Sequence, residues 1–163
     1  MNNKPLLIGI DAGVNTGFAT WDGESLTLDT LTITRAMAKV MVLKEATDCN
    51  IHVFVEDARK RHWFGNAGRE RLMGAGSVMR DCSIWEDFLT EQGIQFTLVP
   101  PKYNMTKLDA DRFRAMTHYK GRTNEHNRDA AMLVFGRNPK DFAIRPNSDL
   151  ELLQSIIKQN YES

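Results

Sequence analysis

Two largely apolar runs, each followed at once by a carboxylate, constrain the fold of this chain most. Residues 5–10 lead into Asp11, and residues 51–55 lead into Glu56. Strands of this near-continuous apolar character are typical of the buried centre of an α/β sheet, where helices cover both faces. We therefore expect two central strands, each of which carries one acidic side chain at its carboxyl end.

The segment between these runs predicts a hairpin and then a helix. Residues 17–21 and 26–33 flank Asp22-Gly23, which is a strong local signal for a hairpin turn. Residues 35–47 carry apolar side chains at helical spacing, namely Met37, Val40 and Met41. A helix that connects two strands favours a right-handed crossover between parallel neighbours. The two acids are therefore expected at the same edge of the sheet.

The second half of the chain predicts one more strand, over residues 96–99, among several helices. These helices are expected over residues 69–92, 106–117, 125–135 and 150–157. The apolar stripe of the longest consists of Val78, Met79, Cys82, Trp85, Phe88 and Leu89. A chain of 163 residues fits one domain. Within it we expect a core over about residues 5–136 and a C-terminal helical extension over residues 137–163.

Two carboxylates at one sheet edge repel each other unless a cation lies between them. Asp11 and Glu56 therefore predict a metal site, and oxygen ligands favour Mg²⁺ or Mn²⁺ over zinc. His126 and Asp129 lie three residues apart near the start of a predicted helix, so they project from one face and can complete that site. The sequence leaves a second interpretation open for this pair, in which polar residues here cap the helix.

The net charge is zero, but the charges are unevenly distributed along the chain. Residues 58–80 and 101–128 together hold thirteen of the 21 basic residues and only four acids. Such segments can form a positive face for phosphates on a neutral protein. They can equally be ordinary solvated loops and helix faces.

One of these basic segments also contains two adjacent aromatic residues, Trp63 and Phe64, just after Arg59, Lys60 and Arg61. Aromatic side chains in an exposed loop can stack on unpaired bases. The alternative is that one of the two packs into a core or a dimer interface.

Several classes of protein are disfavoured by the sequence. The two cysteines, Cys49 and Cys82, lie far apart and form no zinc-binding pattern, so we expect reduced thiols that serve in packing. No apolar run approaches the ~18 residues of a membrane span, and residues 1–11 do not resemble a secretion signal. We expect a cytoplasmic protein without a membrane partner or a small-molecule cofactor.

Residues 8–17 have the sequence IGIDAGVNTG, residues 72–76 have LMGAG and residues 126–131 have HNRDAA. Together with Glu56, these motifs resemble those of the RuvC-type Holliday junction resolvases of the ribonuclease H-like superfamily. The first resembles, with one residue fewer between its second Gly and Thr, their opening G-I-D-x-G-x-x-x-T-G, and the last looks like their closing acidic helix. Glu56 matches the middle acid, and residues 72–76, LMGAG, are similar to the start of the long helix that follows. The resemblance covers about residues 5–136 with the motifs in the family's order.

This resemblance implies an α/β, ribonuclease H-like fold with a mixed five-stranded sheet flanked by helices, in which strands 1–3 are antiparallel and strands 4 and 5 are parallel to strand 1. It implies a homodimeric endonuclease that cuts four-way DNA junctions with two divalent ions, Mg²⁺ or a substituting Mn²⁺. The metal ligands would be Asp11, Glu56, His126 and Asp129.

The resemblance also implies roles for basic residues outside the acidic motifs. Lys102 and Lys107 match, by position, two basic residues of the family near the scissile phosphate, although ordinary surface lysines are the alternative. The expected DNA contacts are Arg59, Lys60, Arg61, Trp63, Phe64, Arg69, Arg71, Lys120 and Arg122.

Other interpretations stay open from the sequence. The same fold serves nucleases that act on branched DNA more broadly or on RNA, and a non-catalytic junction-binding module is a further alternative. ATP-binding proteins related to actin and sugar kinases open with a similar motif, but they need two such domains. Asp57, directly after Glu56, is either a further ligand or a solvated acid.

Overall fold

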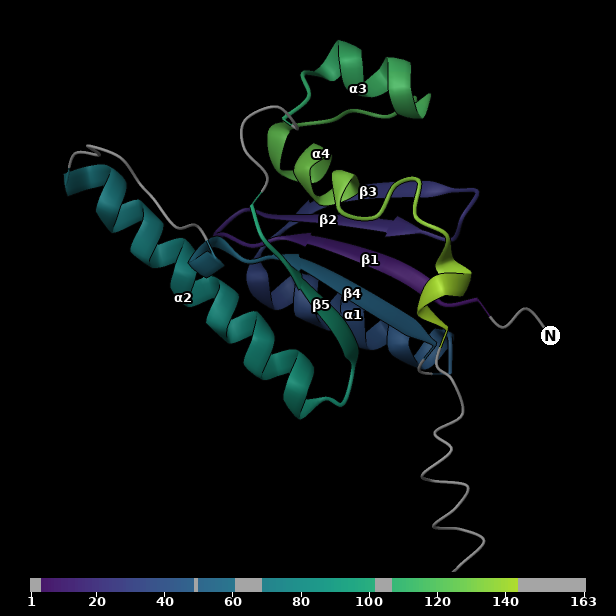
Figure 1. Ribbon diagram of the computed structural model, residues 1–163, viewed down its shortest axis with the longest axis horizontal. Coiled ribbons are helices and arrows are strands. Elements are labelled where there is room, and N and C mark those ends of the chain that lie inside the picture. Colours follow the sequence, from purple (N-terminus) through teal and green to yellow (C-terminus); the bar gives the residue numbers. More distant parts are fainter. Residues whose placement is uncertain (1–3, 49, 61–68, 102–106, 144–163) are drawn as a thin grey trace, which may run out of the picture.

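The computed structural model describes residues 4–48, 50–60, 69–101 and 107–143. Its centre is a five-stranded sheet in the order β3-β2-β1-β4-β5 (Figure 1). The central strand β1 (Leu6–Asp11) pairs antiparallel with β2 (Thr16–Trp21), which pairs antiparallel with β3 (Leu26–Leu31). The hairpin turn lies at the predicted Asp-Gly pair, where Gly23 has a φ of 98°.

The other half of the sheet is parallel. Strand β4 (Ile51–Glu56) pairs parallel with β1, and β5 (Gln95–Val99) pairs parallel with β4. Ile10 is the register partner of Val55, so Asp11 and Glu56 follow side by side at the carboxyl ends of their strands. The mixed sheet and the shared edge of the two acids are therefore as predicted.

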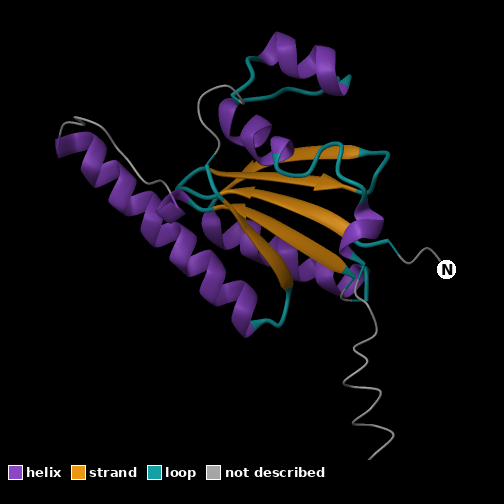
Figure 2. Cartoon of the chain, viewed as in Figure 1, coloured by secondary structure: helices purple, strands orange, loops and turns teal. Residues whose placement is uncertain are grey.

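Helices lie on both faces of the sheet, as Figure 2 shows by the placement of the helices around the strands. On one face, α1 (Ile33–Ala46) and α2 (Arg69–Glu91) pack through Val40, Trp85 and Leu89 against the apolar side chains of β1 and β4. On the other face, α4 (Glu125–Met132) packs through Ala130 and Ala131. Both faces of the central strands are thus buried, which explains their near-continuous apolar sequence.

Two glycines allow α4 to lie directly on the sheet. A Cβ at Gly9 would overlap the carbonyl oxygen of Ala130, and a Cβ at Gly17 would overlap the carbonyl oxygen of His126. Any other residue at these positions of β1 and β2 would therefore push the helix away. This close approach places the start of α4 at the carboxyl end of β1.

Several predicted boundaries were wrong. The helix expected over residues 106–117 is α3 (Ala110–Thr117), because Asp109 caps it by accepting a hydrogen bond from the amide of Arg112. The helix expected over residues 125–135 ends at Met132, where the amides of Leu133 and Val134 turn to carbonyls three residues back. In the predicted extension, residues 139–142 form a 3-10 helix, η3 (Pro139–Phe142). The helix predicted over residues 150–157 lies outside the described residues.

Cys82 is a buried free thiol, in line with its expected role in packing, and Cys49 is not among the described residues. None of the helices in the described part of the chain is long and apolar enough to cross a membrane.

Candidate active site

The candidate site begins at Asp11, the last residue of the central strand. Its side chain is 20% exposed, and its Oδ2 lies 3.2 Å from Nδ1 of His126 at the start of α4. The two residues are 115 positions apart in the sequence. Their contact follows from the glycine-mediated approach of α4 to β1 and β2.

The electrostatic environment of Asp11 is unfavourable for a lone carboxylate. Burial, together with the negative charges of Asp129 and Glu56, raises the pKa of Asp11 to about 7, against the opposing effect of the hydrogen bond and charge of His126. The charges of Glu56 on β4 and Asp129 on α4 therefore act on Asp11 of β1 at this sheet edge.

Helix capping explains Asn124 and Asn127 at the start of α4 but does not explain Asp129. Asn124 is the N-cap: its side chain accepts from the amide of Asn127, and the side chain of Asn127 accepts from the amide of Asn124. Asp129 takes no part in this cap. The capping interpretation is therefore wrong for Asp129 and leaves its carboxylate available to the site.

Asp129 faces a lysine at the site. Its side chain is 15% exposed, and its Oδ2 lies 3.7 Å from Nζ of Lys107. Burial raises the pKa of Asp129 above its usual value, the charge of Lys107 lowers it, and Glu125 acts to raise it. Of the two lysines predicted for catalysis, Lys107 is thus beside the acids, and Lys102 is outside the described residues.

A pocket with a cavity volume of about 90 Å³ opens beside these residues. Its charged lining residues are Glu56, Lys107, Asp129 and Arg137, and its apolar lining residues are Val99, Pro100, Met132 and Leu133. The guanidinium of Arg137 lies 4.5 Å from the centre of the Phe54 ring. The site is therefore an acidic edge with an adjoining, partly apolar recess, and nothing in the sequence pattern pointed to Arg137.

The donor chemistry fits a hard divalent cation. Within the described residues, no three His, Cys, Asp or Glu side chains already stand in metal-binding geometry. The carboxylates of Asp11, Glu56 and Asp129 nevertheless supply oxygen donors. Burial and then the charges of Asp129 and Glu56 raise the pKa of Asp11, and a cation among the three acids would relieve this repulsion. His126 adds an imidazole nitrogen next to Asp11.

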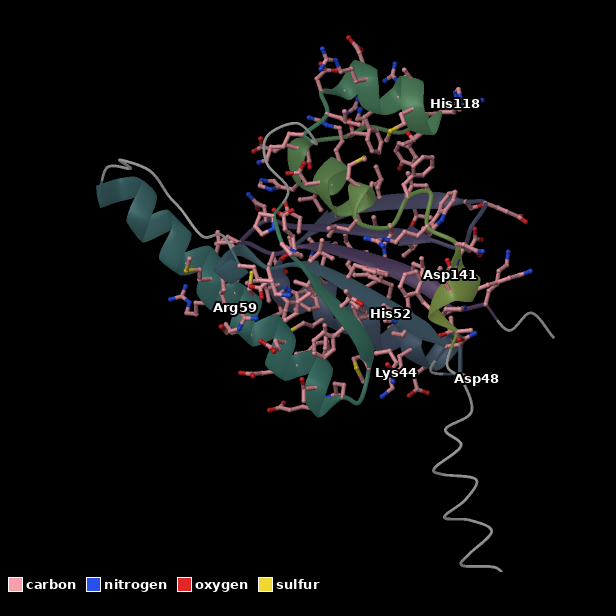
Figure 3. All side chains as sticks on the ribbon, in the orientation of Figure 1. Lys44, Asp48, His52, Arg59, His118 and Asp141 are labelled. Carbon is pink, nitrogen blue, oxygen red and sulfur yellow. The ribbon has the colours of Figure 1, made fainter. Side chains whose placement is uncertain are left out.

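The other described histidines lie elsewhere (Figure 3). His52 donates to or accepts from Oγ1 of Thr97 at 2.7 Å, and burial together with Arg137 lowers the pKa of His52 to about 4. His118 is the left-handed C-cap of α3. His126 is thus the histidine that the fold brings to Asp11.

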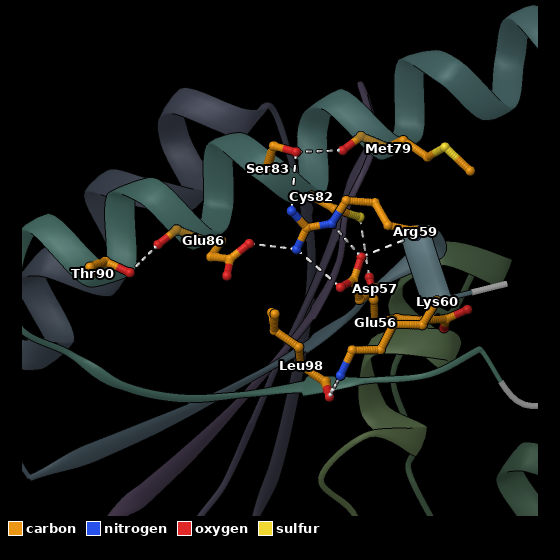
Figure 4. Close-up of polar contacts among 10 residues, drawn as sticks. All are labelled: Glu56, Asp57, Arg59, Lys60, Met79, Cys82, Ser83, Glu86, Thr90 and Leu98. Atoms are coloured by element: carbon orange, nitrogen blue, oxygen red, sulfur yellow. Dashed lines mark hydrogen bonds and ion pairs between the residues drawn. The ribbon is translucent and has the colours of Figure 1, made fainter.

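The predicted DNA contacts differ in where they lie. Lys60, Lys120 and Arg122 are exposed, and Arg69 and Arg71 belong to the first turn of α2. Arg61, Trp63 and Phe64 lie outside the described residues. Arg59 is engaged within the protein, because its guanidinium contacts the carboxylates of Asp57 and Glu86 (Figure 4).

Asp57 matches neither interpretation that the sequence left open. It is 2% exposed, so it is not a solvated acid. Both of its carboxylate oxygens accept hydrogen bonds from Arg59, at 2.8 and 3.0 Å, so it is already paired with an internal cation. The arginine holds the pKa of Asp57 below its usual range against the opposing effect of burial. Of the two adjacent acids, Glu56 lines the pocket, and Asp57 is paired with Arg59.

Comparisons with known proteins bear on the fold. No protein-family model matches the chain, and no curated protein matches it. Among solved structures, T. thermophilus RuvC in complex with a Holliday junction substrate is similar, with a TM-score of 0.51 and 16% sequence identity over 79% of this chain and 89% of that one. At this identity the similarity concerns the fold alone. The chain therefore has the ribonuclease H-like fold that its sequence predicts.

Proposed function

We propose that this protein is a metal-dependent endonuclease that cuts branched DNA, four-way (Holliday) junctions above all. One observation carries the proposal: β1, β4 and α4 bring Asp11, Glu56, His126 and Asp129 together at one edge of a ribonuclease H-like sheet. The junction in the complex of the similar RuvC structure supports the choice of substrate.

The four residues Asp11, Glu56, His126 and Asp129 would hold two Mg²⁺ ions, with Mn²⁺ as a substitute. Such ions supply an activated water and neutralise charge in the in-line displacement at a phosphodiester. Asp11 is the residue best suited to be shared between them, because it interacts with both Glu56 and Asp129. The Nδ1 of His126 fixes the orientation of the Asp11 carboxylate.

Lys107 contributes positive charge at the same place. Its side chain is 68% exposed, so it can contact a phosphate that approaches Asp129 from solvent. A cation at this position stabilises the negative charge that develops on the phosphate during the reaction. We assign Lys102 the same role from its position in the sequence.

DNA binding is assigned to the exposed cations Lys60, Lys120 and Arg122, to Arg61, Arg69 and Arg71, and to Trp63 or Phe64 as a stacking residue at the branch point. Arg59 is left out, because two carboxylates already engage its guanidinium.

A four-way junction is close to two-fold symmetric, so we also assign a homodimer with one site per strand to be cut. We expect the protein to act in the cytoplasm as a single domain.

A substrate series tests the proposal. Four-way junctions, flaps, linear DNA duplexes and RNA duplexes are incubated with the protein in Mg²⁺ and in Mn²⁺. We expect the four-way junction to be cut fastest, in both metals, and no cleavage in EDTA. Faster cleavage of flaps or RNA would indicate a nuclease with a broader substrate class than four-way junctions. Junction binding without any cleavage would instead indicate a non-catalytic binding module.

A further inference from the structure

A buried ion pair follows directly after the candidate ligand Glu56. Asp57 is 2% exposed, and Arg59 contacts it three times (Figure 4). The side chain of Arg59 donates to Oδ1 of Asp57 from Nε at 2.8 Å and to Oδ2 from Nη2 at 3.0 Å, and the backbone amide of Arg59 donates to Oδ1 at 3.1 Å. This paired geometry fixes the guanidinium plane against the carboxylate.

The same guanidinium reaches α2. Its Nη2 lies 2.6 Å from Oε2 of Glu86, and its Nη1 donates to Oγ of Ser83 at 3.2 Å. Arg59 therefore contacts two acids, one beside Glu56 in the sequence and one on the long helix. Its side chain is 30% exposed, in contrast to the fully solvated arginine expected of a phosphate contact.

The backbone that carries Glu56 is held by several neighbours at this point. The amide of Asp57 donates to the carbonyl of Val99 at 2.8 Å, and Sγ of Cys82 donates to the carbonyl of Glu56 at 3.4 Å. Nζ of Lys60 donates to the carbonyl of Leu98 at 3.0 Å. The ion pair adds a charged link to α2, since Arg59 joins the turn after β4 to Glu86.

We propose that Arg59 is a positioning residue, which fixes the end of β4 and so the metal-binding carboxylate of Glu56 by linking Asp57 to Glu86 and Ser83 of α2. The proposal rests on the proposed function, in which Glu56 is a ligand. Residues that orient a ligand from outside the site act on metal affinity without touching the metal. Without Arg59, the buried Asp57 carboxylate loses its counter-charge, and the turn must move to let solvent reach it.

Two variants separate this role from DNA binding, because they act on opposite charges. Arg59→Met removes the cation, and Glu86→Gln removes a negative charge on α2 while it leaves the Asp57–Arg59 pair in place. If Arg59 binds a phosphate, Arg59→Met weakens junction binding and Glu86→Gln leaves it unchanged or strengthens it. If Arg59 is a positioning residue, both variants weaken metal binding. Glu91→Gln, an exposed acid on the same helix, is the matched control.

The first measurement is Mn²⁺ affinity without DNA, from electron paramagnetic resonance of free Mn²⁺, beside junction affinity in EDTA. We expect Arg59→Met to lose about tenfold in Mn²⁺ affinity, the lower end of the range for such orienting residues. Glu86→Gln should change it in the same direction by less, and Glu91→Gln should match wild type. Junction affinity should be unchanged in Arg59→Met. Unchanged Mn²⁺ affinity together with weaker junction binding would overturn the proposal.

A second measurement keeps the proposal distinct from the proposed function. If Arg59→Met does not fold, the Mn²⁺ affinity of Glu86→Gln alone tests the proposal. A wild-type Mn²⁺ affinity in Glu86→Gln then contradicts a positioning role for Arg59. If the wild-type protein binds no Mn²⁺, the metal-site function fails, and hydrogen exchange at the amides of residues 56–60 then tests Arg59. Faster exchange at these amides in both variants supports the positioning role, and unchanged exchange contradicts it.

Discussion

His126 and Asp11 are in direct contact: Nδ1 of the histidine lies 3.2 Å from Oδ2 of the aspartate, across 115 positions of sequence. This contact joins the start of α4 to the end of the central strand. The contact with His126 favours the charged form of Asp11, whereas burial and two neighbouring acids disfavour it and raise the pKa of Asp11 to about 7. The stability of the protein should therefore depend on the charge of this carboxyl group.

The first prediction concerns stability and pH in the absence of divalent ions. The pKa of Asp11 is about 7 in the folded protein and 3.8 without the fold. Between these values the folded state keeps a proton that the unfolded state releases, so the folded state loses stability as pH rises. Asp11→Asn stays neutral and should be more stable than wild type near pH 8 in EDTA, by up to roughly 4 kcal/mol.

This difference should shrink as the pH falls through 7 and disappear below 3.8, where Asp11 is protonated in both states. Urea unfolding of both proteins across this range, in EDTA, measures it. Equal stabilities at every pH would show that the Asp11 carboxylate carries no penalty in the folded state.

The second prediction concerns metal ions. Mg²⁺ or Mn²⁺ should raise the Tm of the wild-type protein, because a cation that binds the folded state alone stabilises it, by about 2.7 kcal/mol at a hundredfold excess over Kd. Asp11→Asn and Asp129→Asn should show a much smaller rise, and EDTA should reverse the effect. A Tm shift of equal size in all three proteins would mean that the ions bind elsewhere.

The third prediction concerns the close packing of α4 against β2. Gly17→Ala should destabilise the protein by about 1–3 kcal/mol, because its Cβ would overlap the backbone carbonyl of His126 and force the helix outwards. Gly76→Ala is the control: apart from the backbone of its own helix, no atom of the described residues lies within 4 Å of its added Cβ, and alanine favours the helical state of α2. Thermal unfolding compares them, and a Gly17→Ala protein as stable as the Gly76→Ala protein would contradict the close approach.

The fourth prediction concerns Lys107. Lys107→Ala should lower kcat for junction cleavage by about 100-fold, the lower end of what loss of one charge-stabilising donor costs. Junction affinity should change little, because the contact is made to one phosphate among many. Lys140→Ala, an exposed lysine of η3 outside the proposed site, is the control. Single-turnover cleavage separates the two effects, and a loss confined to affinity would make Lys107 a DNA contact only.

Much of the fold and the acidic edge could be predicted from the sequence, because local rules determine them. The near-continuous apolar runs fix β1 and β4 as central strands, and the helix between them makes the pair parallel, so Asp11 and Glu56 share an edge. The position of His126 and Asp129 in one helix, α4, could likewise be predicted from the sequence pattern.

Contacts between distant segments could not be read in the same way. Arg59 looked like one cation of a basic loop, but its partners Ser83 and Glu86 lie 24 and 27 residues further on, and only the packing of α2 brings them near. The start of α3 was predicted at residue 106, but the helix begins at Ala110, because the side chain of Asp109 caps it. Arg137, which follows α4 in the sequence, lines the same pocket as Glu56 of β4, and no local pattern indicates this.

The most direct test of the account is cleavage of a four-way junction by Asp11→Asn compared with wild type in Mg²⁺, together with junction binding in EDTA. The wild-type protein should cut the junction, and the variant should bind it with similar affinity but not cut it, because the carboxylate at the centre of the acidic edge is gone. Cleavage by Asp11→Asn at the wild-type rate would contradict the assignment of this edge as the active site.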